Sequence, residues 1–388
     1  MKIFFDFTSL QTHPCGISVY LSSLYRAMLK QDASLELTTG YNTLRSSNRR
    51  QVREIVDRLV SPKVQCRFHA FPGRIDVSRI PLAGRLFEYH AADYDIVHFP
   101  SHICSSWTPF DSFENAVLSV PDMFAFHQNG LFSTTVDPFR EAILRLLPEQ
   151  AQKVSRIITI SEFSRREINR FLSVPLEKIV SIPLAPQWDM SQLTEKQKAF
   201  PPAKYPELTD KRYFLGVSAL FKHKNWHTLL VAYSKYREKA GGNAVPLVIV
   251  GRPAEPDVTA EVQSCAGVVH IPFASEDELL GLFSHAAGFF MLSYIEGFGL
   301  PLVEAMACGC PACYALGSSM DEIGRDAAFG VQAEDMDAVV EKFERFLDGG
   351  AELAARVEAG RRIAEEYSWS NTARRTLEVF AQVVGAKR

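Results

Sequence analysis

Short apolar runs alternate along the chain with longer segments that space their apolar residues as helices do. In the first half, strand-like runs occupy residues 2–7, 95–100, 115–122 and 156–161, and helix-like segments occupy residues 17–31 and 161–172. In the second half, strands are expected at residues 213–220, 246–251, 267–273, 288–293 and 311–316, and helices at residues 224–240, 276–286 and 301–309. This alternation predicts α/β units with parallel sheets and helices on both faces.

Residues 187–212 interrupt the alternation. They are rich in Pro and Lys and show no sustained period, which predicts a linker between two domains. We therefore expect one α/β domain over residues 1–186 and another over residues 213–365, with ligands at the carboxyl ends of the strands. Residues 366–388 have helical apolar spacing and predict a closing helix.

The composition is that of a globular protein with a substantial core. Of 388 residues, 47% are hydrophobic and 22% charged, and the formal net charge of -3 argues against a general nucleic-acid binder. The N-terminal apolar run is short and interrupted by Asp6, unlike a signal peptide, and no run reaches the roughly 18 apolar residues of a membrane span. Seven scattered cysteines suit free thiols in a reducing cytoplasm.

Two glutamates, Glu296 and Glu304, flank a stretch of glycine and proline after one of the predicted strands. Pro301 suits the first position of a helix, so Glu304 is expected in the first helical turn and Glu296 in the preceding loop. Gly297 and Gly299 let the backbone approach a ligand, and free N–H groups at a helix start bind anions. A favourable first-turn glutamate on an apolar core helix is the alternative, and the spacing alone does not decide between them.

The stretch EGFGLPLVEAMACGCP resembles the E-x7-E signature of retaining, nucleotide-sugar-dependent glycosyltransferases of family 4, which have the GT-B fold. Further segments resemble the family in the same order, among them SLQTHPCGISVYLSSLYRAM, DYDIVHFP, RIITISEFSRREINRFL, FLGVSALFKHKNWHTLLVAY and YSWSNTARRTLEVF. The resemblance implies two Rossmann-like domains facing across a cleft. The first would bind the acceptor and the second the nucleotide sugar, and the closing helix would cross back to the first domain.

The resemblance also implies roles for individual residues. Glu296 would bind hydroxyls of the donor sugar and stabilise the transition state, and Glu304 would accept hydrogen bonds from the nucleotide ribose. Lys224 would neutralise the departing diphosphate, although a solvated lysine at a helix start is the alternative. The donor-binding residues implied are Gly16, Ser218, Lys224, Glu296, Gly297, Phe298, Gly299, Leu300 and Glu304.

The second domain departs from the family pattern at Ser218. The family often has an arginine there, six residues before the lysine, and Lys222 or His223 could supply the missing charge. The N-terminal turn departs too, because Cys15 precedes Gly16 where many relatives have two glycines.

A further departure concerns the histidine of the first domain. Where the family often has His-Asp, this chain has Pro121 and Asp122. His127 follows closely and is our candidate catalytic histidine through a shifted loop, with a solvent-exposed loop histidine as the alternative. Ser161 could face the acceptor or donor, and a helix cap is its simplest role.

No cofactor or metal is expected. Residues 93–95 and 335–337 match an Asp-x-Asp pattern, but the first leads into a strand and the second opens a helix, so both are interpreted as structural. Cys308, Cys310 and Cys313 lack a second ligand cluster of matching spacing and are interpreted as buried small residues.

The function implied is transfer of a hexose with retention, with mannose from GDP-mannose as the expected donor. The acceptor implied is a glycan hydroxyl, on a lipid-linked, polyprenyl-diphosphate oligosaccharide of exopolysaccharide or lipopolysaccharide synthesis. The alternatives are a non-catalytic glycosyltransferase-like subunit that binds nucleotide sugars, or an epimerase or phosphorylase of the same fold. A retaining glycosidase would need two carboxylates roughly 5 Å apart with water access.

The region 45–85 concentrates basic residues interleaved with apolar ones. Ten Lys and Arg stand there against three acidic residues. Such a segment can dock on an anionic membrane surface, and a solvated surface with a few core anchors is the alternative. The expected location is cytoplasmic, peripheral on the inner face of the membrane.

Overall fold

The computed structural model describes residues 1–6, 16–42, 46–69, 90–102, 112–127, 138–188, 205, 208 and 212–386. The chain forms two compact units. The first holds Met1–His127, Val136–Leu184 and Trp369–Arg388, and the second includes Ala185–Ser368. Most of the predicted linker lies outside the described residues.

The first unit is built on a parallel sheet in the strand order β3-β2-β1-β4-β5-β6-β7. Its strands are β1 (Lys2–Asp6), β2 (Glu36–Asn42), β3 (Gln65–His69), β4 (Ile96–Phe99), β5 (Ala116–Ser119), β6 (Arg156–Thr159) and β7 (Ile179–Ser181). The described helices around it are α1 (Gly16–Gln31), α2 (Ser46–Leu59), α4 (Pro138–Lys153), α5 (Glu162–Leu172) and α14 (Trp369–Gly385). Short 3-10 turns are η2 (Ala91–Asp93), η3 (Phe124–Phe126) and η4 (Leu176–Lys178).

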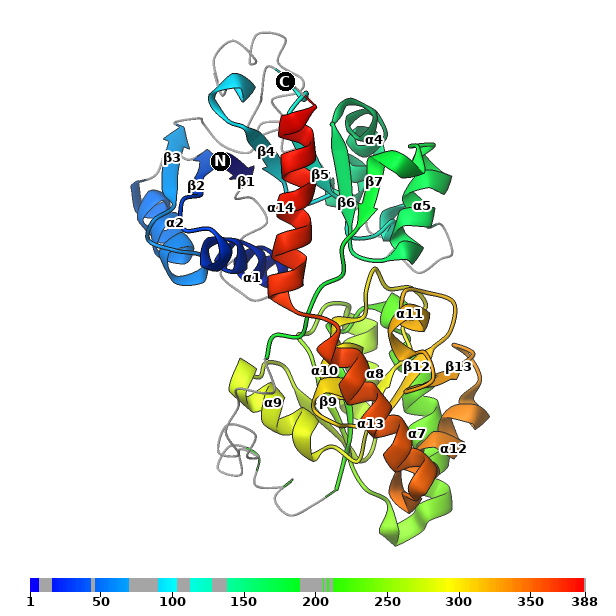
Figure 1. Cartoon of the computed structure of the whole chain (residues 1–388). Helices are drawn as coiled ribbons and strands as arrows, with labels where there is room; N and C mark the ends of the chain where they lie inside the picture. Colours follow the sequence, from blue (N-terminus) through cyan, green and yellow to red (C-terminus); the bar gives the residue numbers. More distant parts are fainter. Residues whose placement is uncertain are drawn as a thin grey trace. The chain divides into compact units, whose positions relative to one another are not determined.

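The closing helix α14 packs on this first unit, beside α1 and against β4 and β6 (Figure 1). Thr372 donates to the carbonyl of Pro183 at 2.8 Å, and Phe380 meets the ring of His98 edge-on at 5.3 Å. The prediction that the C-terminal helix returns to the first domain is confirmed. Its apolar face is buried there, which is what stabilises a helix of this kind.

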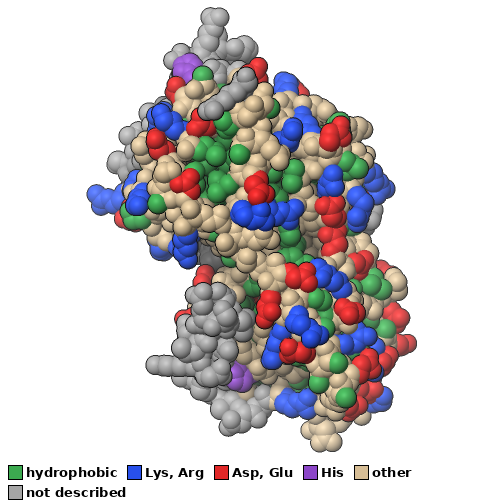
Figure 2. All heavy atoms as spheres, viewed as in Figure 1, with side chains coloured by type: hydrophobic (Ala, Val, Ile, Leu, Met, Phe, Trp, Pro, Cys, Tyr) green, Lys and Arg blue, Asp and Glu red, His purple; other side chains and the backbone are tan. Residues whose placement is uncertain are grey.

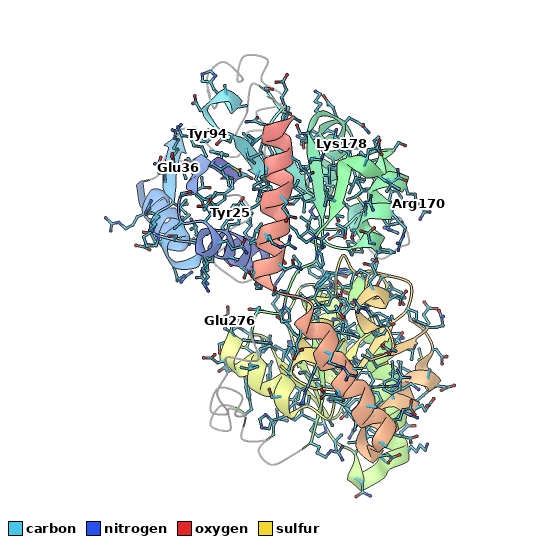
Figure 3. The ribbon with its side chains drawn as sticks, viewed as in Figure 1. Tyr25, Glu36, Tyr94, Arg170, Lys178 and Glu276 are labelled. Carbon is cyan, nitrogen blue, oxygen red and sulfur yellow. The ribbon has the colours of Figure 1, made fainter. Side chains whose placement is uncertain are left out.

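Beneath α14 lies a buried hydrogen-bonded chain of side chains. His98 bonds Tyr25 at 2.6 Å and Ser119 at 2.9 Å, and Ser119 also contacts Tyr20 at 3.0 Å. Tyr25, labelled in Figure 3, comes from α1. Burial lowers the pKa of His98 to about 3, so the imidazole is neutral and its two nitrogens serve as one donor and one acceptor.

The second unit has a parallel sheet in the strand order β10-β9-β8-β11-β12-β13. Its strands are β8 (Phe214–Val217), β9 (Leu247–Val250), β10 (Val268–Ile271), β11 (Gly288–Met291), β12 (Ala312–Ala315) and β13 (Phe329–Val331). Its described helices are α7 (Trp226–Ala240), α8 (Pro256–Ser264), α9 (Glu276–His285), α10 (Leu300–Ala307), α11 (Met320–Gly324), α12 (Met336–Asp348) and α13 (Ala351–Glu365), with turns η7 (Lys222–Lys224) and η8 (Gly241–Asn243).

Both sheets have the doubly wound order of Rossmann-like folds, so the predicted α/β class is confirmed. The expectation for Glu304 needs one correction. Helix α10 begins at Leu300, which makes Pro301 the second helical residue and leaves no acidic residue in the first turn. Glu304 is the fifth residue of α10, because the positive φ of Gly299 (107°) turns the chain into the helix one residue earlier than expected.

Candidate functional site

The loop between β11 and α10 is held by a serine from a neighbouring loop. The hydroxyl of Ser319 lies 2.8 Å from the carbonyl oxygens of both Glu296 and Phe298 and can donate to either. A Cβ added at Gly299 would lie 3.0 Å from Met320, and its φ of 107° disfavours other residues. The main chain beside Glu296 is thus fixed at two points.

Glu296 forms an ion pair with Lys224, which the sequence places 72 residues earlier. The Nζ–Oε1 distance is 2.7 Å, and the two side chains are only 16% and 14% exposed. A second bond joins their loops, since the N–H of Tyr294 donates to the carbonyl of His223 at 3.0 Å. Partial burial makes this ion pair stronger than an exposed one. A ligand that replaces Glu296 as the partner of Lys224 must therefore carry a comparable negative charge.

The N-terminus of α10 adds main-chain donors beside this pair. The N–H groups of Leu302 and Val303 bond back to the carbonyl of Gly299, at 2.9 and 3.3 Å. Within the described residues the structure records no acceptor for the N–H groups of Gly299 and Leu300. Together with Lys224, these groups make a site with the chemistry to bind a phosphate.

Glu304 lies inside the second unit with only 2% of its surface exposed. The main-chain N–H and side-chain amide of Gln187 both donate to its Oε1, at 3.4 and 3.2 Å. Burial raises the pKa of the Glu304 carboxyl to about 8, although the hydrogen bonds from Gln187 act in the opposite direction. A buried glutamate of this kind is the acceptor or donor of hydrogen bonds rather than a solvated surface charge.

Ser218 and the nearby residues Lys222 and His223 each contact a different partner. Lys222 pairs with Asp257 at 2.8 Å, a hydrogen bond that raises the pKa of the ammonium group. His223 stacks on Phe221 with ring centroids 5.5 Å apart. Ser218 donates its N–H to Val250 in the extension of β8. Lys224 is therefore the cation of this turn that contacts the predicted site residue Glu296.

In the first unit, His127 is engaged by an acidic residue that sequence reasoning did not single out. Its Nε2 lies 2.6 Å from a carboxylate oxygen of Glu167 on α5, and the two side chains are 18% and 9% exposed. Phe171 supports the imidazole edge-on at 5.1 Å. Arg170, labelled in Figure 3, contacts the other oxygen of Glu167 at 3.3 Å. The imidazole of His127 is thus largely buried and is fixed by its contacts, in contrast to a solvent-exposed loop histidine.

The other predicted residues of the first unit lie at helix starts. Ser161 caps α5, because its hydroxyl accepts the N–H of Ser164 at 3.0 Å. Gly16 is the first residue of α1. The helix-cap interpretation of Ser161 is therefore correct, and it agrees with the serine's 3% exposure.

The Asp-x-Asp segments have local partners. Asp95 accepts the main-chain N–H of Lys2 at 2.7 Å, Asp335 caps α12, and Asp337 pairs with Lys235 at 2.9 Å. Over the described residues, no group of three or more His, Cys, Asp or Glu is arranged to hold a metal ion. Cys308, Cys310 and Cys313 are buried and form no disulfide.

Part of the basic region 45–85 is described. Arg53 is tied to Asp57 at 2.8 Å and to the carbonyls of Pro62 and Val64, and Arg67 lies over the ring of Tyr94. Residues 70–89 lie outside the described part. Figure 2 shows basic and acidic side chains mixed over the visible face of both units. Among the described helices, none combines the length and apolar content needed to cross a membrane.

Two structural features define the class of this protein. Each unit is a Rossmann-like domain, and the second carries a lysine–glutamate pair, helix N–H donors and a buried glutamate around one loop. Solved structures confirm the GT-B fold. Sucrose-phosphate synthase from Thermosynechococcus elongatus matches with a TM-score of 0.73 at 16% identity, covering 99% of each chain. Anabaena Alr3699/HepE in complex with UDP and glucose matches with 0.71 at 14% identity, over 98% of this chain and 100% of that one.

Two family models match the chain one after the other. Residues 14–185 match Glycosyltransferase Family 4, and residues 197–363 match Glycosyl transferases group 1. Each unit therefore carries a glycosyltransferase family domain, and the family resemblance read from the sequence is confirmed.

Two curated mannosyltransferases match part of this chain at low sequence identity. O-antigen chain mannosyltransferase B of Escherichia coli is 27% identical over 239 residues, which are 60% of this chain and 62% of that protein. The MMP alpha-(1->4)-mannosyltransferase of Mycolicibacterium hassiacum is 26% identical over 242 residues, 60% of this chain and 56% of that protein. The chain thus spans less than two thirds of these relatives.

Proposed function

We propose that the protein is a retaining mannosyltransferase that moves mannose from GDP-mannose to a hydroxyl of a glycan acceptor without a metal ion. The observation that carries this proposal is the partly buried Lys224–Glu296 pair, 2.7 Å apart, beside the N–H groups that begin α10. The names of both relatives support mannose as the sugar. The O-antigen chain in the name of the first supports a glycan chain as the product. The choice of GDP as the donor nucleotide rests on the family resemblance described in the sequence analysis.

The pair provides the charges that this reaction needs. A donor diphosphate would compete with Glu296 for the ammonium group of Lys224, and the helix N–H groups would bind its oxygens. Glu296, released from Lys224, would accept hydrogen bonds from the sugar hydroxyls. Its negative charge would then stabilise the positive charge that develops at the anomeric carbon.

The bonds that break and form in this reaction can be accounted for without a protein side chain acting as a base. The bond between the anomeric carbon and the diphosphate oxygen breaks, and its electron pair stays on the diphosphate. The acceptor oxygen forms the new bond on the same face of the sugar, and its proton passes to the departing diphosphate. Lys224 neutralises the charge of this leaving group throughout.

The test is turnover with defined donors and analysis of the product. GDP-mannose, UDP-glucose and UDP-galactose are offered with polyprenyl-diphosphate-linked oligosaccharides, and the anomeric configuration of the new bond is read by NMR. An α-linked mannose from GDP-α-mannose, formed equally well with EDTA present, is the expected result. A β-linked product, or activity that EDTA abolishes and Mn²⁺ restores, would contradict retention or metal independence.

Variants connect this activity to the site. Lys224→Ala and Glu296→Gln should each lower kcat by roughly 10²- to 10³-fold, the usual effect of removing one group that stabilises transition-state charge. Lys235→Ala is the matched control, because Lys235 lies 48% exposed on α7 and pairs with Asp337. Full activity in both site variants would overturn the assignment.

His127 is proposed as a further catalytic residue, supported by its 2.6 Å contact with Glu167. If His127 hydrogen-bonds the donor or acceptor, His127→Ala should lower kcat by about tenfold, the effect of losing one hydrogen bond of about 1.4 kcal/mol. His90→Ala, at an exposed histidine of the same unit, is the control. Unchanged kinetics would leave His127 with a structural role only.

We further propose that the protein works on the inner face of the membrane through the region 45–85. Replacing Arg74, Arg79 and Arg85 by Ser should reduce binding to vesicles that contain anionic lipid, and salt should weaken the binding of the unchanged protein. Equal binding to neutral and anionic vesicles would refute this docking.

A further inference from the structure

Gln187 has no role in the function proposed so far, yet both of its N–H donors converge on a single atom. Its main-chain N–H and side-chain amide lie 3.4 and 3.2 Å from Oε1 of Glu304. The next residue, Trp188, meets the ring of Phe283 on α9 edge-on at 6.1 Å. The start of the second unit is therefore attached to both α9 and α10.

This arrangement makes the two oxygens of Glu304 unequal. Oε1 accepts two N–H groups, so a proton on the neutral carboxyl must sit on Oε2. In the described part of the chain, the structure records no partner for Oε2. The charged neighbour that acts on Glu304 is Glu276 at the start of α9 (Figure 3), and a carboxylate brings no donor. Oε2 is thus the oxygen that remains for a ligand.

We propose that Gln187 is a positioning residue of the nucleoside site, which holds the Glu304 carboxyl by Oε1 and leaves Oε2 to bind a ribose hydroxyl. The proposal rests on the proposed function, in which Glu304 meets the ribose of a nucleotide. Gln187 itself does not touch the ligand. Without Gln187, the Glu304 carboxyl can rotate. Binding the ribose would then have to order this carboxyl, which lowers the affinity for the nucleotide.

The consequence is a preference for ribose that depends on Gln187. Gln187→Met keeps the length of the side chain and removes its donor, while the main-chain N–H stays. Loss of one such hydrogen bond should weaken GDP binding by about 5- to 10-fold. Binding of 2′,3′-dideoxy-GDP, which lacks the hydroxyls, should change by less than about twofold. Gln187→Glu places an acceptor against Oε1 and should weaken GDP binding more than Gln187→Met.

Isothermal titration of the full chain with GDP, UDP and their 2′,3′-dideoxy analogues tests this, with thermal midpoints recorded for every variant. Glu304→Met, which removes both carboxyl oxygens at a similar side-chain length, serves as the background for a double-mutant cycle. If Gln187 acts through the Glu304 carboxyl, Gln187→Met should add no further loss in that background. The same pattern with UDP in place of GDP supports the inference equally.

The outcomes separate the two proposals. Binding of neither GDP nor UDP to the unchanged protein overturns the proposed function and this inference with it. If a nucleotide binds and Gln187→Met keeps the full preference for ribose, the inference alone is overturned. Equal weakening of ribose and dideoxyribose nucleotides also overturns it, because Gln187 would then act on the fold of the site and not on the ribose contact.

Discussion

Replacing Glu304 by Gln should change how the stability of the second unit depends on pH. Burial raises the pKa of Glu304 from 4.5 to about 8 in the folded chain. Between these values the unfolded chain has lost the proton and the folded chain keeps it. The folded state therefore binds more protons, and its stability falls as the pH rises.

The size of the effect follows from the two pKa values. Since each pH unit inside the window is worth about 1.4 kcal/mol, the free energy of unfolding should fall by about 2.5 kcal/mol between pH 5.5 and 7.5 on account of Glu304. Glu304→Gln lacks this titration and keeps an amide oxygen to accept the N–H groups of Gln187. The difference between the two proteins should therefore move by the same amount in favour of the variant.

Urea unfolding at several pH values measures this difference. Hydrogen–deuterium exchange on peptides from α10 restricts the measurement to the second unit, which a two-unit chain requires. Glu358→Gln, at an exposed position of α13, is the control and should keep the pH dependence of the unchanged protein. A difference between wild type and Glu304→Gln that is flat from pH 5.5 to 7.5 would show an ionised Glu304 and refute the reasoning from burial.

Three further predictions concern stability. Gly251→Ala puts a Cβ 1.8 Å from the carbonyl oxygen of Ser218 and should cost roughly 2 to 4 kcal/mol, whereas Gly242→Ala meets no atom within 4 Å and should be nearly neutral in the same urea titration. Ser161→Ala removes the cap of α5 and should cost about 1 kcal/mol; an unchanged midpoint would contradict the cap. Phe380→Ala removes a fully buried side chain of α14 and should cost about 3 to 5 kcal/mol, seen first as faster exchange in peptides of α14.

Most strands of the two sheets were predictable because their signal is local. A short run such as residues 247–250 is apolar throughout and buried throughout, since helices cover both faces of a parallel sheet. The edge strands β3, β7 and β13 were missed. β2 was also missed, because its sequence ELTTGYN mixes polar residues into a strand that pairs on both sides. Its position follows from pairing with β1 and β3, which no local pattern encodes.

For the candidate site, too, some residues were predictable from the sequence and others were not. Spacing and resemblance together single out Glu296, Glu304 and Lys224, because glycines and a proline mark the loop and a strand precedes it. No spacing indicates that Gln187 donates to Glu304 across 117 positions, or that Glu167 meets His127 across 40. These partners are brought together only when the helices and loops that carry them pack around the sheets.

The sequence by itself therefore determined the class of fold, most of the strands and the loop of Glu296, all of which depend on neighbours along the chain. The tertiary structure decided the state of the side chains. Glu304 is neutral near pH 7 because folding removes it from water, and Lys224 is paired because the turn after β8 meets the loop after β11. Burial and pairing are properties of the packed molecule, and they leave one glutamate of the motif paired with a lysine and the other buried and neutral.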